Sequence, residues 1–408
     1  MNSRIRRRLA YLSGAPRVST RPEAYLSGPR SHVLGVMKAF ERLGWDVVPY
    51  IVGDRMPLNI VMEKDTKTGF HFGKLAAADL IRIGMGPWHG WKAFCEIGKV
   101  DWVYERFGAF QAMGWWFQRH GIPWILETNG VLYSESTRDR KTILLPQIAR
   151  IFELKAYQSS DVLVCVSKQL ADLIVQDFNI DPSKIVILPN GVDTDIFNPL
   201  RYTPKRLFQE PTIGFVGALH PWHAVELLIE ALAELRKEGA NLKAVIIGDG
   251  PKFSSCEQLV RERGLQAHIH FTGWIPPTEI PAYIAGFDIG YALQGARTHS
   301  EKLGSSLKLY EYAAMGKPVI ASAHENTNGL IIDRVTGYLQ RTDDLAELVQ
   351  ILREAYASRE QWQFMGMKAR QMVIEKHSWE ARVKELLPQL HSILEVKYGS
   401  PFPAGYRR

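Results

Sequence analysis

Apolar and polar residues follow two periods along this chain, and these predict strands and helices in regular alternation. Short apolar runs, such as residues 9–12 and 162–166, are typical of buried strands. Stretches such as residues 33–43 and 168–178 instead repeat their apolar positions at helical spacing. Because a helix follows a strand almost throughout, the pattern predicts an α/β fold with parallel sheets covered by helices on both faces.

The predicted elements form two similar series, separated by a polar, basic stretch at residues 200–210 that suits a linker. The first series is expected to contain strands at 9–12, 45–52, 101–105, 124–127, 162–166 and 185–188, and helices at 33–43, 107–118, 144–157 and 168–178. The second is expected to contain strands at 212–216, 243–247, 268–272, 289–293 and from 319, and helices at 224–237, 252–263, 279–285, 307–315 and 379–396. The Pro-Trp-His triplets at 87–89 and 221–223 are expected in loops.

The composition is that of a folded globular protein. The 408 residues allow two or three domains of ordinary size, and 46% hydrophobic with 23% charged residues argues against disorder. Cys95, Cys165 and Cys256 form neither a disulfide framework nor a metal-ligand cluster, so we expect a reducing, cytoplasmic compartment. We expect no membrane-spanning helix and no secretion signal.

The net charge of +7 is concentrated near the start of the chain. Residues 1–200 carry 25 Lys and Arg against 20 Asp and Glu, and residues 201–408 carry 25 against 23. Arg4, Arg6, Arg7 and Arg8 account for most of the first excess. They predict peripheral contact with an anionic membrane, at about 1 kcal/mol per charge, or else a solvated terminus. No basic helix with interleaved aromatic residues accompanies them, so nucleic acid is not an expected partner.

The stretch at residues 301–319 carries the clearest candidate chemistry. Gly304, Ser305 and Ser306 predict a turn with two helix-capping hydroxyls, and its free backbone N–H groups would suit a phosphate. Lys308 and Glu311 lie three residues apart on one face of the helix that follows. The lysine could meet a diphosphate and the glutamate could hold sugar hydroxyls; a surface ion pair is the alternative.

Other loops at strand ends offer further candidates. Residues 28–32 begin with a glycine and lie after the first strand, near the carboxyl edge where open α/β sheets bind ligands. The loop is not Gly-x-Gly-x-x-Gly, so it is a weak dinucleotide signal. Asp193-Thr194-Asp195 invites a metal site, but a turn after Asn-Gly explains it as well, and we expect no metal and no cofactor.

Four segments, taken together and in this order, resemble glycosyltransferase family 4, retaining enzymes with the two-domain GT-B fold. These segments are Pro-Asn-Gly-Val-Asp at the start of 189–199, the strand, loop and helix from Gly217, Gly-Asp-Gly-Pro at 248–251, and residues 304–318. The resemblance runs from about residue 28 to 379. It implies two doubly wound Rossmann-like domains facing each other across a cleft: 1–200 for the acceptor, 201–378 for a nucleotide sugar, and 379–408 crossing back to the first.

The resemblance also implies roles for particular residues. Glu311 matches the family glutamate that binds the nucleotide ribose. The residues expected around the donor are Gly217, Gly250, Gly273, Trp274, Ile275, Leu303, Gly304, Ser305, Ser306 and Leu307. The residues expected on the acceptor and diphosphate side are Gly28, Arg30, Arg106 and Glu127.

The chain departs from the family pattern at five positions. Leu303 stands where the family has its first glutamate, and Ala218, His223 and Ala224 stand where it has an arginine, a lysine and a glycine. Asn129 replaces the family's active-site histidine. We expect Lys308 to supply the missing charge, with His223 and Asn129 as further catalytic groups; a packing histidine and an ordinary turn asparagine are the alternatives.

The predicted function is that of a metal-independent, retaining glycosyltransferase. It would move a hexose from a UDP- or GDP-linked sugar to the hydroxyl of a lipid, a lipid-linked glycan or a small metabolite, in polysaccharide or glycolipid synthesis. Two alternatives stay open: a nucleotide-sugar-binding protein that has lost catalysis, and a GT-B-fold UDP-sugar epimerase.

Overall fold

The computed structural model describes residues 7–24, 27–58, 72–139, 142–295, 305–323, 327, 329–342 and 344–399. Arg4, Arg6, Leu303 and Gly304, for which roles were predicted, lie outside these residues. The chain divides into two compact units. Unit 1 comprises the described residues of 1–190 and 382–408 together with Ser305, and unit 2 comprises those of 191–302 and 306–381.

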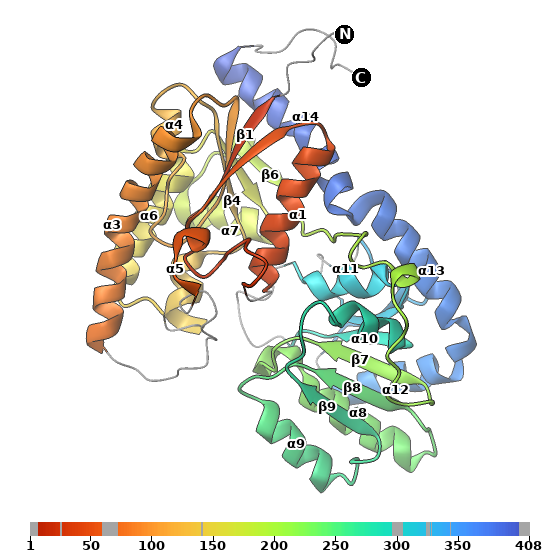
Figure 1. Ribbon diagram of the computed structural model, residues 1–408. Helices are drawn as coiled ribbons and strands as arrows, with labels where there is room; N and C mark the ends of the chain where they lie inside the picture. Colours follow the sequence, from red (N-terminus) through yellow and green to blue (C-terminus); the bar gives the residue numbers. More distant parts are fainter. Residues whose placement is uncertain are drawn as a thin grey trace. The chain divides into compact units, whose positions relative to one another are not determined.

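Unit 1 is built on a six-stranded parallel sheet in the order β2-β1-β3-β4-β5-β6 (Figure 1). Its strands are β1 (Arg8–Ser13), β2 (Asp46–Ile51), β3 (Trp102–Arg106), β4 (Trp124–Thr128), β5 (Val162–Cys165) and β6 (Ile185–Ile187). Its helices are α1 (Gly28–Arg42), α3 (Phe72–Ile97), α4 (Trp115–Gln118), α5 (Leu132–Ser134), α6 (Pro146–Ser159) and α7 (Lys168–Phe178). The strand order reverses between β1 and β3, so this carboxyl edge is the expected ligand site.

Unit 2 has a second six-stranded parallel sheet, in the order β12-β11-β10-β7-β8-β9. Its strands are β7 (Thr212–Val216), β8 (Lys243–Ile247), β9 (Ile269–Gly273), β10 (Ile289–Ala292), β11 (Val319–Ser322) and β12 (Gly337–Gln340). Its helices are η5 (Pro221–His223), α8 (Val225–Lys237), α9 (Phe253–Glu262), α10 (Ile280–Gly286), α11 (Leu307–Ala314), α12 (Leu345–Ala357) and α13 (Trp362–Met372). The order reverses between β7 and β10, the dinucleotide-fold pattern.

The last helix, α14 (Trp379–Tyr398), packs on unit 1 from Arg382 onward. The His391 ring lies 4.7 Å from that of Trp102, and the Tyr398 hydroxyl donates to Asp161 at 3.0 Å. Both sheets and their helices confirm the predicted α/β fold class. Within the described part of the chain, no helix is both long and apolar enough to cross a bilayer.

Two local predictions were wrong. Residues 107–114 form turns rather than the start of a helix, because the buried Glu105 carboxylate accepts the backbone N–H groups of Met113 (2.9 Å) and Gly114 (2.8 Å) and holds the segment against the sheet. The Pro-Trp-His triplet at 87–89 lies inside α3, not in a loop. The helix continues through Pro87 where it packs closely on residue 110: a Cβ on Gly86 would lie 2.6 Å from the Phe110 carbonyl oxygen.

Candidate active site

At the carboxyl edge of the unit 2 sheet, three positions in the loops after β7 and β8 can hold only glycine. Gly217, Gly248 and Gly250 have φ angles of 148°, 129° and 157°. A Cβ on Gly248 would lie 2.1 Å from the Gly217 carbonyl oxygen, and one on Gly250 would lie 2.6 Å from the Leu219 nitrogen. The loops that follow β7 and β8 therefore touch through backbone, and no side chain extends from these three positions.

Lys308 lies at this edge in the first turn of α11. Its Nζ is buried and has no hydrogen-bond partner among the described residues; it lies 4.4 Å from the Phe215 ring centroid. A Cβ on Gly217 would lie 3.3 Å from this Nζ, which places the amine beside the glycine loop. Burial lowers the pKa of Lys308 to about 7, although Glu311 raises it. Burial therefore makes this amine easier to deprotonate in the ligand-free site than an exposed lysine.

Glu311 follows one turn later and lacks a hydrogen-bonded partner for its side chain in the described part of the chain. Burial raises the pKa of the Glu311 carboxyl to about 7, opposed by the charge of Lys308. The amine of Lys308, buried without a hydrogen-bond partner among the described residues, is costly in the free protein, and the half-buried Glu311 carboxyl lies one turn away from it. Such a pair is what a site for a charged, hydroxyl-rich ligand would contain.

The turn before α11 differs from its prediction. Ser306 is the N-cap residue, but its hydroxyl makes no capping hydrogen bond. The Ser305 hydroxyl accepts the backbone N–H of Asn190 at 3.2 Å. The prediction that both serine hydroxyls cap α11 was therefore wrong. The Ser305 hydroxyl binds a residue distant in sequence, and the Ser306 hydroxyl does not bond to the first N–H groups of the helix. Gly316 has φ 69° and confirms the predicted helix stop.

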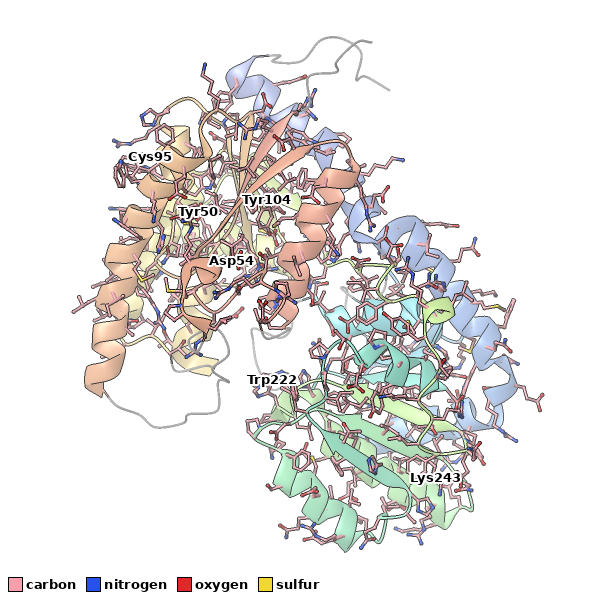
Figure 2. All side chains as sticks on the ribbon, viewed as in Figure 1. Tyr50, Asp54, Cys95, Tyr104, Trp222 and Lys243 are labelled. Carbon is pink, nitrogen blue, oxygen red and sulfur yellow. The ribbon has the colours of Figure 1, made fainter. Side chains whose placement is uncertain are left out.

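His223 ends η5, and its Nδ1 lies within hydrogen-bond distance of the Ala218 carbonyl oxygen. Burial first, and then the charge of Lys308, lowers the pKa of His223 to about 2. The imidazole is therefore neutral at physiological pH and cannot supply the charge of the missing lysine. Trp222, labelled in Figure 2, stacks on His220 at 4.2 Å in the same short helix.

The remaining residues predicted to bind the donor lie at the end of β9 and at the start of α11. Gly273 ends β9 with φ 64°, and its carbonyl accepts the N–H of Gly248 at 2.9 Å. Trp274 follows it, half exposed, whereas Ile275 packs against the unit 2 core. Leu307 begins α11 and is half-buried.

In unit 1 the carboxyl edge contains a buried polar cluster around Glu127. The Tyr104 hydroxyl donates to Glu127 Oε2 at 2.7 Å, and His32 Nε2 lies 2.5 Å from Glu127 Oε1. Burial alone would raise the pKa of Glu127, but the charge and hydrogen bond of His32 and the charge of Arg106 outweigh it and hold that pKa below its ordinary value. Glu127 is therefore an ionised acceptor.

His32 connects this cluster to the 189–199 junction. Its Nδ1 lies 2.8 Å from Asn190 Oδ1, and Asn190 donates its Nδ2 to the Ser305 carbonyl oxygen. The buried ring therefore lies between Glu127 and Asn190. Sequence reasoning left His32 and Asn190 out of the site; the available signals were the position of His32 in the first turns of α1 and that of Asn190 in the 189–199 junction.

Of the residues predicted on the acceptor side, some have side chains without hydrogen bonds among the described residues, whereas Arg30 is engaged within the protein. Arg106 ends β3 beside this cluster, and its guanidinium has no hydrogen-bond partner within the described residues. The Asn129 side chain, one residue past β4, also has none there. Arg30 is instead buried and donates to the carbonyls of residues 19, 20 and 21. Gly28 begins α1 behind the N-cap Ser27.

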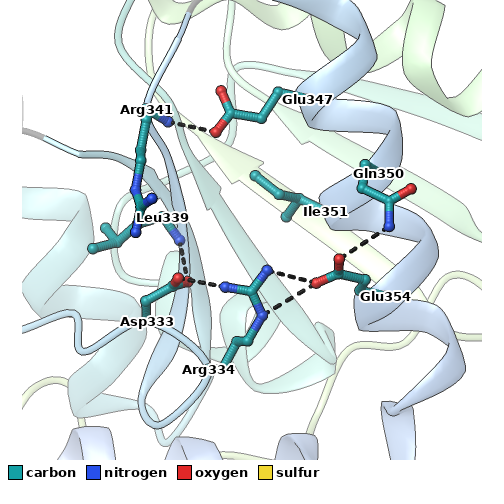
Figure 3. A pocket seen from close by; sticks show the side chains of 8 residues that line it. All are labelled: Asp333, Arg334, Leu339, Arg341, Glu347, Gln350, Ile351 and Glu354. Carbon is teal, nitrogen blue, oxygen red and sulfur yellow. Dashed lines mark hydrogen bonds and ion pairs between the residues drawn. The ribbon is translucent and has the colours of Figure 1, made fainter.

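Two other features contain acidic groups. The Asp193 carboxylate accepts the N–H groups of Asp195 (3.0 Å) and Ile196 (3.2 Å), as in an Asx turn. A cavity of about 130 Å³ lies between β12 and α12 (Figure 3). Its three carboxylates already have partners: Arg334 lies 2.7 Å from Glu354, Glu347 accepts the backbone N–H of Arg341 at 3.0 Å, and Asp333 accepts that of Leu339 at 3.0 Å. The acidic groups of this cavity are therefore engaged within the protein.

Known proteins share both halves of this architecture. The family model described as "Glycosyltransferase Family 4" matches residues 26–196, and that described as "Glycosyl transferases group 1" matches residues 204–372. A GDP-mannose-dependent alpha-(1-6)-phosphatidylinositol monomannoside mannosyltransferase of Mycolicibacterium smegmatis is 27% identical over 257 residues, 60% of this chain and 66% of that protein. A D-inositol 3-phosphate glycosyltransferase of Gordonia bronchialis is 26% identical over 310 residues, 72% of this chain and 66% of that protein. The chain thus spans just under two thirds of the length of these relatives.

Solved structures show the same fold at low identity. Sucrose-phosphate synthase from Thermosynechococcus elongatus superposes with a TM-score of 0.67 at 16% identity, covering 96% of this chain and all of that one. HepE of Anabaena in complex with UDP superposes with a TM-score of 0.62 at 14% identity, covering 94% of this chain and all of that one. The solved structures show the GT-B fold, and the two family models, which together match most of the sequence, show that the chain belongs to glycosyltransferase family 4.

Proposed function

We propose that this chain is a retaining glycosyltransferase that moves a hexose from a nucleoside-diphosphate sugar to a hydroxyl acceptor. The observation that supports this most directly is the pair Lys308 and Glu311 at the glycine-lined edge of unit 2: the amine is buried without a hydrogen-bond partner among the described residues, and the half-buried carboxyl lies one turn later. Lys308 faces the diphosphate and Glu311 the ribose hydroxyls. The donor carries GDP or UDP; a GDP-mannose-dependent relative and the UDP bound to HepE support these two nucleotides.

The acceptor is a phosphate-bearing inositol or a related polyol, free or attached to a lipid. The names of the two relatives, which include a phosphatidylinositol mannoside and an inositol 3-phosphate, support this class. A lipid acceptor would place the protein at the cytoplasmic face of a membrane. Unit 1 binds the acceptor, with the Asn129 amide and the unpartnered guanidinium of Arg106 as its candidate contacts.

The chemistry that this site must supply is stabilisation of the leaving group. Negative charge grows on the nucleoside diphosphate as the glycosidic bond breaks. A bound diphosphate raises the pKa of the Lys308 amine, so the amine is fully charged when that charge develops. Because Lys308 supplies the charge, the reaction needs no metal ion and turnover persists in excess EDTA.

The test compares turnover of Lys308→Met with that of wild type, with EDTA present. We expect Lys308→Met to lower kcat by roughly 100-fold or more, with a smaller rise in the donor KM, because the charge matters most in the transition state. Lys308→Arg should restore part of the rate. Lys317→Met is the matched control, since Lys317 is also buried but donates to the Ala285 carbonyl at 2.8 Å. Near wild-type turnover in Lys308→Met, or a loss in EDTA that Mg²⁺ or Mn²⁺ reverses, would sink the proposal.

A further inference from the structure

Helix α3 of unit 1 buries one face against the sheet layer and leaves the other exposed. Its buried face carries Asp79, His89 and Ala93, spaced at helical intervals. The Asp79 carboxylate accepts the N–H groups of Leu144 (2.8 Å) and Leu145 (3.0 Å), which ties the helix to the start of α6. The orientation of α3 about its own axis is therefore fixed by these contacts.

The opposite face of α3 is apolar, whereas a surface helix normally presents polar residues there. We call this set the α3 outer face; it consists of Leu80, Ile81, Gly84, Pro87, Trp88, Trp91 and Cys95. Leu80 is 64% exposed, Ile81 60%, Trp88 51% and Trp91 50%. Between residues 80 and 95 every exposed residue is uncharged. Apolar surface of this extent on one helix marks an interaction site.

Helix α6 extends the same apolar surface. The two helices lie side by side in Figure 1, and Ile83 of α3 packs in one small core with Ala149 and Phe152 of α6. Ile148 and Ile151 of α6 are exposed as well. The apolar surface therefore spans two adjacent helices of unit 1, and the label of Cys95 in Figure 2 marks its end near the α3 C-terminus.

The charges at the C-terminal turn of α3 are positive on balance. Lys92 Nζ lies 5.1 Å from the Trp88 ring centroid. Arg55 and Lys92 share the carboxylate of Glu96, at 2.5 and 3.7 Å. Two cations thus stand against one carboxylate beside the exposed tryptophans, which complements an anionic surface.

We propose that the α3 outer face binds the headgroup region of an anionic lipid bilayer, lying parallel to it. An interfacial helix of this kind carries Trp and Leu on its apolar face and Lys or Arg at its margin. Indole rings favour this boundary because one edge is apolar and the N–H is polar. The inference does not depend on the proposed acceptor, since a transferase with a soluble acceptor could use the same surface. It assigns membrane contact to α3 rather than to the first arginines: Arg7 and Arg8 already contact His391 (2.9 Å) and Asp46 (2.9 Å).

The test is co-sedimentation of the full-length chain with vesicles of phosphatidylcholine, with or without about 30% phosphatidylglycerol. We expect binding to the anionic vesicles that weakens as salt increases, and little binding to phosphatidylcholine alone. Trp88→Ser with Trp91→Ser should weaken binding by about tenfold or more. The matched control is Phe364→Ser with Met367→Ser, which removes two equally exposed apolar residues from α13 and should change binding by less than about twofold.

Two further measurements distinguish loss of membrane contact from misfolding of the tryptophan variant. Leu80→Gln with Ile81→Gln tests the same face if the tryptophan variant does not fold, and fluorescence quenching of the wild type by brominated lipid reports tryptophan insertion directly. Nucleotide-sugar binding and transfer to a water-soluble acceptor should be unchanged in both variants, which separates this inference from the proposed function. Absence of vesicle binding, equal binding by the α3 variants, or self-association that Trp88→Ser with Trp91→Ser abolishes would overturn the proposal; the last would make the face an interface between copies of this chain.

Discussion

At the residue scale, the donor site is organised by two groups that the free protein holds at a cost. Burial lowers the pKa of Lys308 and raises that of Glu311, each to about 7, because neither finds a full partner in the ligand-free site. A lysine with a lowered pKa destabilises the fold wherever it is protonated, and a glutamate with a raised pKa does so wherever it is ionised. Under the proposed function, a bound nucleoside diphosphate would offset this cost by contacting both groups.

The pair predicts a specific pH dependence of donor binding. A diphosphate favours charged Lys308, so affinity falls as pH rises above about 7; ribose hydroxyls favour ionised Glu311, so affinity falls as pH drops below about 7. Wild type should therefore bind a nucleoside-diphosphate sugar best near pH 7. Glu311→Gln should remove the decline on the acid side and weaken binding by roughly 1.5–3 kcal/mol near pH 7.

The measurement is isothermal titration calorimetry between pH 5.5 and 9, roughly 1.5 to 2 units either side of the pKa of the pair. An intact sugar nucleotide is used because both of its phosphates are esterified and do not titrate there. An acid-side decline that persists in Glu311→Gln would assign it to another group. His223→Ala should leave the shape of the profile unchanged, because His223 is neutral throughout this range.

At the element scale, the loops of unit 2 contain positive φ angles, which residues with a Cβ adopt only at a steric cost. Glycine occupies these positions at Gly217, Gly248 and Gly250, but Ala224, the N-cap of α8, lies in the left-handed region with φ 48° and ψ 35°. This is the position where the family pattern has glycine. The Tyr291 hydroxyl donates to the Ala224 carbonyl at 2.7 Å and helps to hold the strained residue in place.

Ala224→Gly should stabilise the protein by about 0.5–1 kcal/mol, because glycine adopts the left-handed region without the steric cost of a Cβ. Thermal or urea unfolding followed by circular dichroism measures the change. Ala231→Gly in the middle of the same helix is the opposite control and should destabilise by about 1 kcal/mol. If both variants lose stability equally, the backbone at Ala224 is not strained.

At the scale of the whole molecule, the chain has two parallel sheets, each with a candidate site at its own carboxyl edge. Unit 2 carries the amine and carboxyl suited to a nucleotide, and unit 1 carries the imidazole of His32, the guanidinium of Arg106 and the amide of Asn129. The division of labour proposed here, donor on unit 2 and acceptor on unit 1, follows from these groups.

Hydrogen exchange of the full-length chain tests this division. A saturating sugar nucleotide should slow exchange in peptides covering residues 217–224, 248–252 and 305–312, since these amides line the unit 2 edge. The acceptor should act on peptides around residues 28–31 and Asn129. Nucleotide protection confined to unit 1 would reverse the assignment.

Sequence pattern alone determined the order and type of most elements. The strands at 212–216 and 243–247 and the helix at 168–178 have the bounds that their apolar spacing predicts. The glycine after each strand and the Lys308 and Glu311 pair were also evident, because strand ends and helical spacing depend on neighbours a few residues apart.

Only the tertiary structure decided the features that depend on distant partners. The contact between His32 Nδ1 and Asn190 Oδ1 joins residues 158 positions apart. The turns at 107–114 follow from the buried Glu105, and the helix through Pro87 from packing against Phe110. The pKa values near 7 at Lys308 and Glu311 likewise arise from burial, which spacing does not report. Local periodicity specifies which segments form elements, whereas desolvation and long-range hydrogen bonds, which exist only after the sheets assemble, specify the chemistry at their edges.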